Sequence, residues 1–151
     1  MTSYNAITNL LYRYAEHIDS GNLEAAADMF RHARIKRGPG ILLSHSDILA
    51  FWRQIVVIYA DGTPRTRHMV TNPIVEIDEV AGAAACRSCY TVLQHLDDFP
   101  LQVIAVGRYH DEFERVDGEW RFSFRDYSFM DFRGDLSRHI PSTLPGFATR
   151  I

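Results

Sequence analysis

The apolar residues of this chain change their spacing once, at Asp61-Gly62-Thr63-Pro64, and this change constrains the fold more than any other feature. Before it, apolar residues recur at intervals of three or four, which predicts amphipathic helices. After it, they alternate with polar residues for most of the remaining chain, which predicts strands. Helices followed by a run of antiparallel strands indicate an α+β fold in which the helices pack on one side of a curved sheet.

Three helices are expected in the first part of the chain. The first ends near Asp19 and has one apolar stripe, formed by Ile7, Leu11, Tyr14 and Ile18. Gly21 suits its end and Asn22 suits the N-cap of a second helix over residues 23–30. The third helix, residues 48–59, is apolar on nearly every side, so we expect the sheet and also a partner chain or a lid to cover it.

Four long strands are expected after the helices, over residues 65–77, 83–95, 101–115 and 119–127. Asp117-Gly118 marks a tight hairpin between the last two. Short extended pieces at 33–35 and 41–43 flank a turn at Gly38-Pro39-Gly40. We expect residues 1–151 to form a single domain with a loop-rich C-terminal arm over 127–151.

Composition narrows the class of protein. The 151 residues are 46% hydrophobic and carry a formal net charge of −3 without a basic stripe, which argues against nucleic acid as a partner. No signal peptide is visible, and the longest apolar run, residues 55–60, is too short to span a bilayer. We therefore expect a cytoplasmic protein that does not bind membranes.

Known cofactor and metal motifs are absent from the sequence. Cys86 and Cys89 lie in an expected strand, where positions three apart face opposite sides, so two reduced thiols are expected. No HxH, HxxxH, GxSxG, GxGxxG or GxxxxGK[ST] pattern occurs. The sequence thus predicts no metal site, no nucleotide cofactor and no hydrolase triad.

Asp19 and His68 are the candidates for proton-transfer chemistry. Asp19 lies at the corner between the first two helices, where it either caps the second helix or faces inward to hold a basic partner. His68 lies near the start of a strand, either as a general base or as a partly buried, hydrogen-bonded histidine. His17, His32 and His139 are expected to be solvated, and His95 and His110 are assigned no role. A carboxylate next to His68 would fix its tautomer.

Three segments carry a resemblance to a known family: YRYAEHIDSGNLEAAADMF, RTRHMVTN and YHDEFERVDGEWRFSFRDYSF. Over residues 4–132 the chain resembles the SnoaL-like branch of the nuclear-transport-factor-two-like superfamily, which includes scytalone dehydratase, bile acid dehydratase and hexachlorocyclohexane dehydrochlorinase. The resemblance implies a cone of three helices wrapped on a strongly bent mixed sheet, with an apolar pocket at its open end. It also implies a pairing of Asp19 with His68 and roles for Arg125 and Tyr14 in the same site.

The resemblance implies a cofactor-free, dehydratase-like lyase that acts on a small, mostly apolar, possibly cyclic substrate. His68 would take the proton, Asp19 would orient His68, and Arg125 and Tyr14 would steady the leaving group or enolate. The alternatives are a non-catalytic binding or subunit-assembly module of the same fold, and a polyketide cyclase or ketosteroid-type isomerase. A homo-oligomer, dimer or trimer, is expected in each case.

Arg125 provides the sharpest expectation about side-chain placement. Simple alternation places it on the strand face opposite Trp120, Phe122 and Phe124, together with Tyr127. If that face lines the cone, Arg125 is a buried cation that needs a nearby carboxylate or an anionic group on the substrate.

Overall fold

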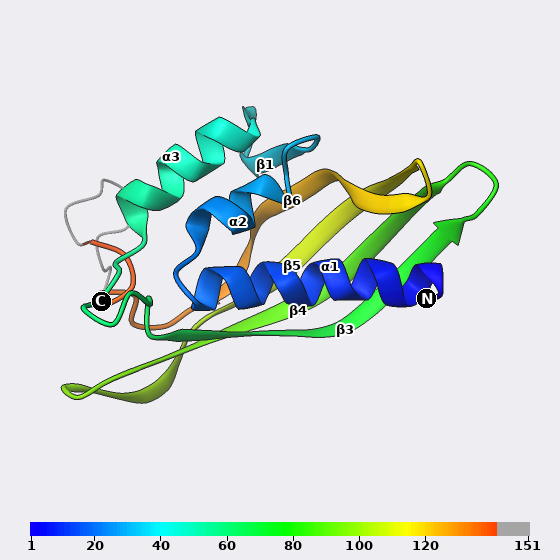
Figure 1. The fold of residues 1–151 in the computed structure, drawn as a ribbon. Helices are drawn as coiled ribbons and strands as arrows, with labels where there is room; N and C mark the ends of the chain where they lie inside the picture. Colours follow the sequence, from blue (N-terminus) through cyan, green and yellow to red (C-terminus); the bar gives the residue numbers. More distant parts are fainter. Residues whose placement is uncertain (142–151) are drawn as a thin grey trace.

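A computed structural model describes residues 1–141 as three helices and one six-stranded sheet with the strand order β2-β1-β6-β5-β4-β3 (Figure 1). The elements are α1 (Ser3–Asp19), α2 (Leu23–Asp28), β1 (Arg34–Gly38), β2 (Ile41–Leu43), α3 (His45–Ile55), β3 (Thr66–Asp78), β4 (Ala83–Leu96), β5 (Phe99–Val116) and β6 (Glu119–Arg133). All neighbouring strands pair antiparallel except β1 and β6, which are parallel, so the sheet is mixed. The predicted α+β class is confirmed.

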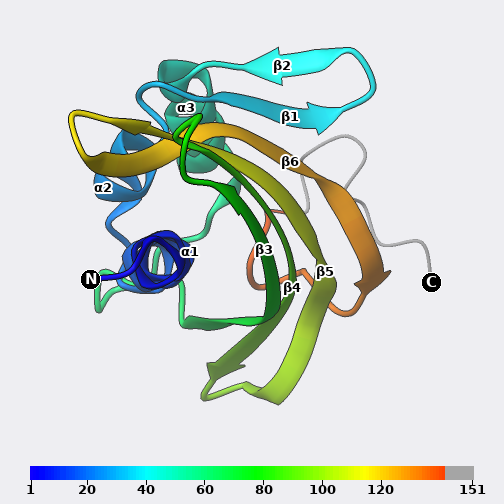
Figure 2. The ribbon, with the colours of Figure 1, turned by 90° about the vertical axis from the view of Figure 1, so that its right-hand side faces the viewer.

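The sheet bends strongly, and the helices lie on its inner side (Figure 2). The stripe predicted for α1 is buried there, with Ile7, Leu11, Tyr14 and Ile18 each at most 4% exposed. The helix begins at the N-cap Thr2 and gives way to Gly21, whose φ of 76° favours glycine. A side chain at Gly21 would also collide with the Gly62 carbonyl, so glycine lets α1 end against the 59–63 loop.

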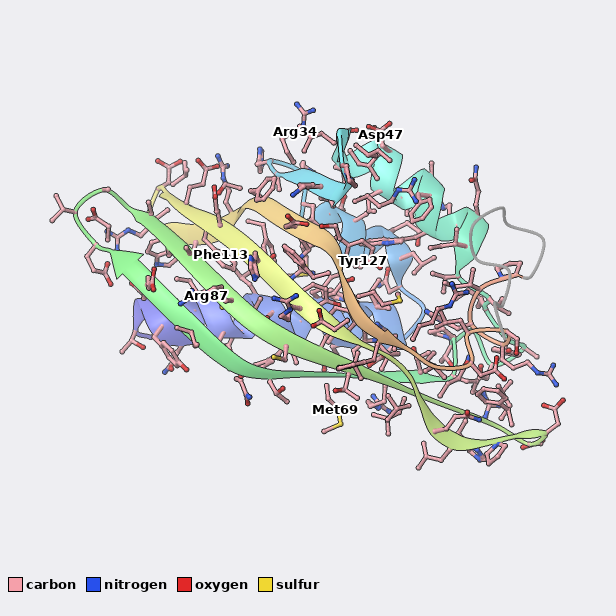
Figure 3. The ribbon with its side chains drawn as sticks, turned by 180° about the vertical axis from the view of Figure 1, so that it is seen from behind. Arg34, Asp47, Met69, Arg87, Phe113 and Tyr127 are labelled. Carbon is pink, nitrogen blue, oxygen red and sulfur yellow. The ribbon has the colours of Figure 1, made fainter. Side chains whose placement is uncertain are left out.

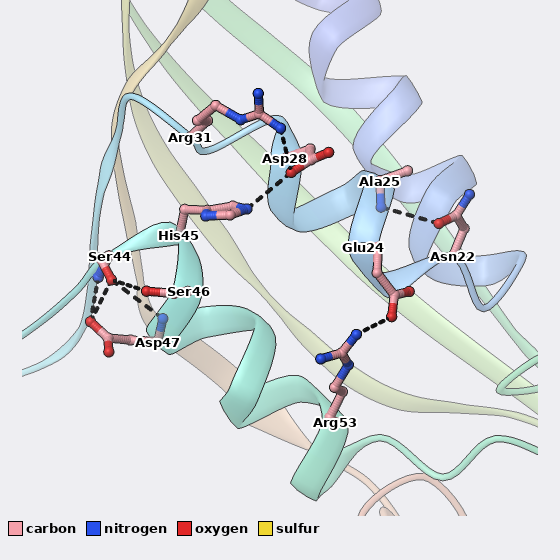
Figure 4. A network of polar contacts seen from close by, with 10 residues as sticks. All are labelled: Asn22, Glu24, Ala25, Asp28, Arg31, Ser44, His45, Ser46, Asp47 and Arg53. Atoms are coloured by element: carbon pink, nitrogen blue, oxygen red, sulfur yellow. Dashed lines mark hydrogen bonds and ion pairs between the residues drawn. The ribbon is translucent and has the colours of Figure 1, made fainter.

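Polar contacts join the two short helices, α2 and α3 (Figure 4). His45 Nε2 lies 3.0 Å from Asp28 Oδ1, and Arg53 pairs with Glu24. Ser44 and Asp47 form a capping box at the start of α3, as expected for a serine cap followed by an acidic first turn. These contacts fix α3 above the concave side of the sheet.

The helix α3 ends at Ile55, four residues before the expected end at Tyr59. Val56 is its C-cap in an extended conformation, and the Val57 N–H donates to the His139 carbonyl at 3.0 Å. The apolar run after Ile55 is therefore not a helix face. It is an extended segment that packs against the C-terminal part of the chain, which explains why the apolar residues appeared on every side.

The strand β6 contains a bulge that overturns the predicted placement of Arg125. Phe122 pairs with Phe113, whereas Phe124 pairs with Glu112, so β6 has one extra residue, Ser123, at this point. An extra residue reverses the alternation beyond it. Arg125 therefore lies on the same inner face as Phe122 rather than opposite to it, and it is only 1% exposed.

The strand β6 continues to Arg133, six residues beyond its expected end. The chain then turns back: Gly134 N–H donates to the Ile104 carbonyl at 2.9 Å, and Leu136 and Ile140 are buried. Tyr59 and the Gln94 amide both donate to the Arg138 carbonyl, at 2.5 and 3.1 Å. Residues 134–141 thus close one end of the sheet, and residues 142–151 of the predicted arm lie outside the described residues.

The outer face of the sheet carries several exposed apolar side chains. Figure 3 views the sheet from this side, with Met69 extending away from β3. Met69 is 50% exposed, Val103 46% and Phe132 72%. Met69 pairs with Thr91, Thr91 with Val106, and Val106 with Phe132, so Met69 and Phe132 lie in one row across the sheet. No described helix is long and apolar enough to span a membrane.

Candidate active site

Asp19 and His68 form the hydrogen-bonded pair expected from the sequence. His68 Nδ1 lies 2.6 Å from Asp19 Oδ1, and the backbone N–H of His68 donates to Asp19 Oδ2 at 2.7 Å. Thr66 Oγ1 donates to Asp19 Oδ1 at 2.9 Å. The side chains of Asp19 and His68 are 4% and 8% exposed. The predicted contact is confirmed, and the capping alternative is wrong because Asn22 caps α2 instead.

The pair has a defined tautomer. A carboxylate can only accept hydrogen bonds, so the proton of neutral His68 is on Nδ1 and the lone pair is on Nε2. Burial would raise the pKa of Asp19, but the hydrogen bonds from His68 and Thr66 outweigh burial and lower it. Asp19 is therefore ionised at neutral pH. The arrangement leaves His68 Nε2 as a base held in a fixed orientation.

His68 lines a cavity of about 270 Å³ on the concave side of the sheet. The walls are mostly aromatic and aliphatic, and its polar groups come from four tyrosines, Trp52, Ser128, Arg37 and two histidines. The described residues lining it are Tyr14, Ile18, Arg37, Phe51, Trp52, Ile55, Val56, His68, Tyr90, Val92, Ala105, Tyr109, Tyr127, Ser128, Met130, Leu136, His139 and Ile140. A mostly apolar pocket with a few convergent polar groups is typical of a small-molecule site.

Tyrosine hydroxyls gather around Tyr14 in this cavity. The Tyr14 ring lies edge-on to that of Tyr109 at 5.9 Å, and Tyr109 stacks on Tyr90 at 4.6 Å. Burial raises the pKa of Tyr14, and the nearby hydroxyl of Tyr127 raises it further. Burial also raises the pKa of Tyr90 and Tyr109. These tyrosines therefore stay protonated and can donate hydrogen bonds to an oxygen that gains negative charge.

Arg125 lies beneath the tyrosines and does not line the cavity. Its Nε and Nη2 donate to the two carboxylate oxygens of Asp111 at 2.7 and 2.8 Å, and both side chains are at most 2% exposed. Its guanidinium carbon is 4.3 Å from the ring centroid of Tyr14 and 4.1 Å from that of Tyr109. The nearby carboxylate predicted for Arg125 is thus Asp111. Because Arg125 does not line the cavity, it does not contact a substrate bound there.

The ion pair below the cavity shifts the pKa of both of its partners. Burial lowers the pKa of Arg125, but Asp111 outweighs that effect and raises it overall. Burial raises the pKa of Asp111, against the opposing pull of Arg125. The positive charge of Arg125 lowers the pKa of Tyr14 and so opposes part of the effect of burial. Arg125 can therefore strengthen Tyr14 as a donor without touching the ligand.

The predictions from the sequence did not place two residues, His139 and Arg37, in the cavity wall. His139 was expected to be solvated in the C-terminal arm, but it lines the cavity, and its buried Nδ1 has no hydrogen-bond partner among the described residues. Burial, with a further contribution from His68, lowers its pKa to about 4, so it is neutral at pH 7. Arg37 was given no role, because the expected extended piece ended at Ile35; it is part of β1 and lines the cavity. Nothing in the local sequence of either residue signals these positions.

The comparisons with known proteins agree with this fold. A family model described as the SnoaL-like domain matches residues 1–126. No curated protein matches the chain.

Several solved structures share the fold at low sequence identity. A proposed scytalone dehydratase from Novosphingobium aromaticivorans DSM 12444 is 19% identical, with a TM-score of 0.66 over 87% of this chain and 86% of that one. From the same organism, an NTF2-like protein with a cystatin-like fold is 20% identical, with a TM-score of 0.67 over 85% and 82%. The beta subunit of a proposed aromatic-ring-hydroxylating dioxygenase is 18% identical, with a TM-score of 0.65 over 91% and 95%. At these identities the likeness is one of fold.

Proposed function

The chain belongs to the SnoaL-like domain family, and we propose that it is a dehydratase-like lyase acting on a small, largely apolar, cyclic molecule. The observation that carries the proposal is the buried Asp19–His68 pair, whose free imidazole nitrogen belongs to a residue of the cavity wall. A base in a fixed tautomer next to an apolar cavity suits the removal of a proton from carbon.

In the proposed reaction, His68 Nε2 takes a proton from a carbon next to the leaving group. The electrons of the broken C–H bond form a C=C bond, and the neighbouring C–O bond breaks with its electron pair going to oxygen. The imidazolium then gives this proton to the leaving oxygen, so that water departs and His68 is neutral again. Asp19 holds the ring and stabilises the imidazolium that forms in between.

Tyr14 is proposed to donate a hydrogen bond to the oxygen on which charge develops. Its raised pKa means that it keeps its proton, so it acts as a donor rather than as an acid that fully ionises. Arg125 is proposed as a positioning residue, because it packs under the rings of Tyr14 and Tyr109 and does not line the cavity.

A second candidate is a non-catalytic binding or assembly module of the same fold. The observation that favours it is the likeness to a dioxygenase beta subunit over 91% of this chain. This alternative requires the cavity but does not require that His68 reacts. Cyclisation or isomerisation by the same base remains a variant of the first proposal, since both begin with the same proton transfer.

The experiment is a thermal-shift screen of ring-hydroxylated and halogenated small molecules, followed by incubation of each binder with the protein in D₂O. We expect at least one binder to lose water or a halide, or to take up deuterium, as measured by mass spectrometry. The variant His68→Asn should keep binding and lose turnover by about 10²- to 10⁴-fold, the usual contribution of a general base.

His110→Asn is the matched control, because His110 packs against Phe129 and does not line the cavity. It should turn over at the rate of the unaltered protein. Binders that are neither converted nor deuterated, or equal turnover by the His68→Asn variant, would refute the lyase proposal and leave the binding module.

A further inference from the structure

Arg37 is the one permanently charged side chain among the described residues that line the cavity. The lining contains no aspartate, glutamate or lysine. The two histidines add no fixed charge, and the tyrosines keep their protons. The positive charge of Arg37 reaches into the tyrosine cluster, because it acts to lower the pKa of Tyr127. The cavity is therefore apolar with one cationic point on its wall.

Arg37 has no anionic partner among the described residues. Its neighbour Lys36 pairs with Asp126 at 2.7 Å, and Lys36 points to the other face of β1. The guanidinium of Arg37 instead lies over the ring of Phe51, with 4.4 Å between its carbon and the ring centroid. Its Nε is buried and donates no hydrogen bond to a described residue. A half-buried cation with a buried N–H that lacks a partner gains from an anion that brings its own acceptors.

The strands place Arg37 and His68 on opposite walls of the cavity. Arg37 is on β1 and His68 is on β3, and β6, β5 and β4 lie between them in the sheet. The sheet curves between these two strands (Figure 2). A ligand in the cavity can therefore meet the base on one side and the cation on the other. The aromatic rings of Tyr14, Tyr90 and Tyr109 line the space in the middle.

We infer that Arg37 binds a carboxylate of the ligand, and that the ligand is a cyclic or aromatic carboxylic acid whose anionic group sits across the ring from His68. One planar guanidinium without a second cation matches one planar monoanion, which it can hold through two parallel hydrogen bonds. A phosphate group would carry about two charges and would call for further donors. The cavity volume of about 270 Å³ limits the ligand to one or two rings.

The inference names the substrate class of the proposed lyase and rests on that proposal for the place of the reacting carbon. The carboxylate site itself requires only binding. Titration calorimetry with 2-naphthoate and cyclohexanecarboxylate, each against its neutral carboxamide, tests it directly. The unaltered protein should bind the acids at least tenfold more tightly than the amides, because a charge-assisted hydrogen bond is roughly twice as strong as a neutral one.

Arg37→Met should weaken binding of the acids by at least tenfold and leave the amides unchanged, which removes the preference. Arg37→Lys keeps the charge but loses the planar fork, so its preference should fall between the two. Arg34→Met is the matched control: Arg34 is on the same strand, is exposed, does not line the cavity, and its loss changes the net charge equally.

The inference is overturned if acids and amides bind alike, if the Arg37→Met variant keeps the preference, if Arg34→Met abolishes it, or if neither acid binds at millimolar concentration. The His68→Asn variant separates this inference from the lyase proposal. It should retain the full preference for acids, because His68 is on the opposite wall. A preference that persists while every bound ring-hydroxylated or halogenated acid of the thermal-shift screen stays unconverted would support the carboxylate site and refute the lyase.

Discussion

The buried ion pair between Arg125 and Asp111 allows a quantitative test of how the floor of the cavity is held together. Both side chains are at most 2% exposed, and the two hydrogen bonds between them are 2.7 and 2.8 Å long. Removing one partner of such a pair leaves a buried charge without compensation, which costs about 3–5 kcal/mol. We therefore expect Arg125→Met and Asp111→Asn each to destabilise the protein by about this amount at pH 7.5.

The two single variants should differ in their dependence on pH. In Arg125→Met the remaining carboxyl can neutralise itself by taking up a proton, and burial already raises the pKa of Asp111. A group whose pKa is raised on folding stabilises the folded state at low pH and loses that effect as the pH rises through the folded pKa. The deficit of Arg125→Met should thus shrink by up to about 1.4 kcal/mol per unit as the pH falls through the raised pKa of Asp111 toward the ordinary carboxyl pKa. In Asp111→Asn the guanidinium cannot lose its proton, so its deficit should not shrink.

The double variant Arg125→Met/Asp111→Leu removes both charges and should lie within about 2 kcal/mol of the unaltered protein, because apolar replacements of buried pairs are often neutral. The free energy of unfolding can be measured by urea titration at pH 7.5 and 5.5, with the fluorescence of Trp52 and Trp120 as the signal.

Arg121→Met is the matched control on the same strand. Arg121 pairs with Glu114 at 2.8 Å, but the two side chains are 35% and 40% exposed, so the loss should stay below about 1 kcal/mol. A loss for Arg125→Met no larger than this, or single-variant losses that simply add in the double variant, would refute the argument.

Three further predictions concern the Asp19–His68 pair, residues 134–141 and assembly. The pKa of Asp19 is lowered on folding, so its contribution to stability is present above the ordinary carboxyl pKa. Asp19→Asn should therefore lower the free energy of unfolding by about 1–3 kcal/mol at pH 7 and by less near pH 3. An equal loss at both pH values would contradict this prediction. His139 has a pKa lowered to about 4, so stability should fall by up to about 3 kcal/mol between pH 6.5 and pH 4, and urea titration of His139→Gln should show a smaller fall. The outer face exposes Met69, Val103 and Phe132, which favours a homo-oligomer. Light scattering at micromolar concentration should give the mass of more than one chain, and the mass of a single chain would contradict the prediction.

Sequence alone was sufficient for features that depend on neighbours along the chain. The stripe of α1, the glycine at its end and the change from helices to strands are local patterns, and the structure has them where they were expected. The Asp19–His68 contact also followed, because one residue ends a helix and the other begins a strand, and the family resemblance indicated that these two ends meet. The assignment of catalytic roles to this pair stays a prediction.

Tertiary structure decided the features that depend on strand register and on distant segments. The bulge at Ser123 turns Arg125 to the inner face, and a bulge is set by the pairing of β6 with β5 rather than by the residues around it. Arg37 faces the cavity because β1 pairs with β6 in parallel, and His139 does so because residues 134–141 fold back across the end of the sheet. Each of these positions is fixed by hydrogen bonds between residues far apart in the chain, which no local pattern encodes.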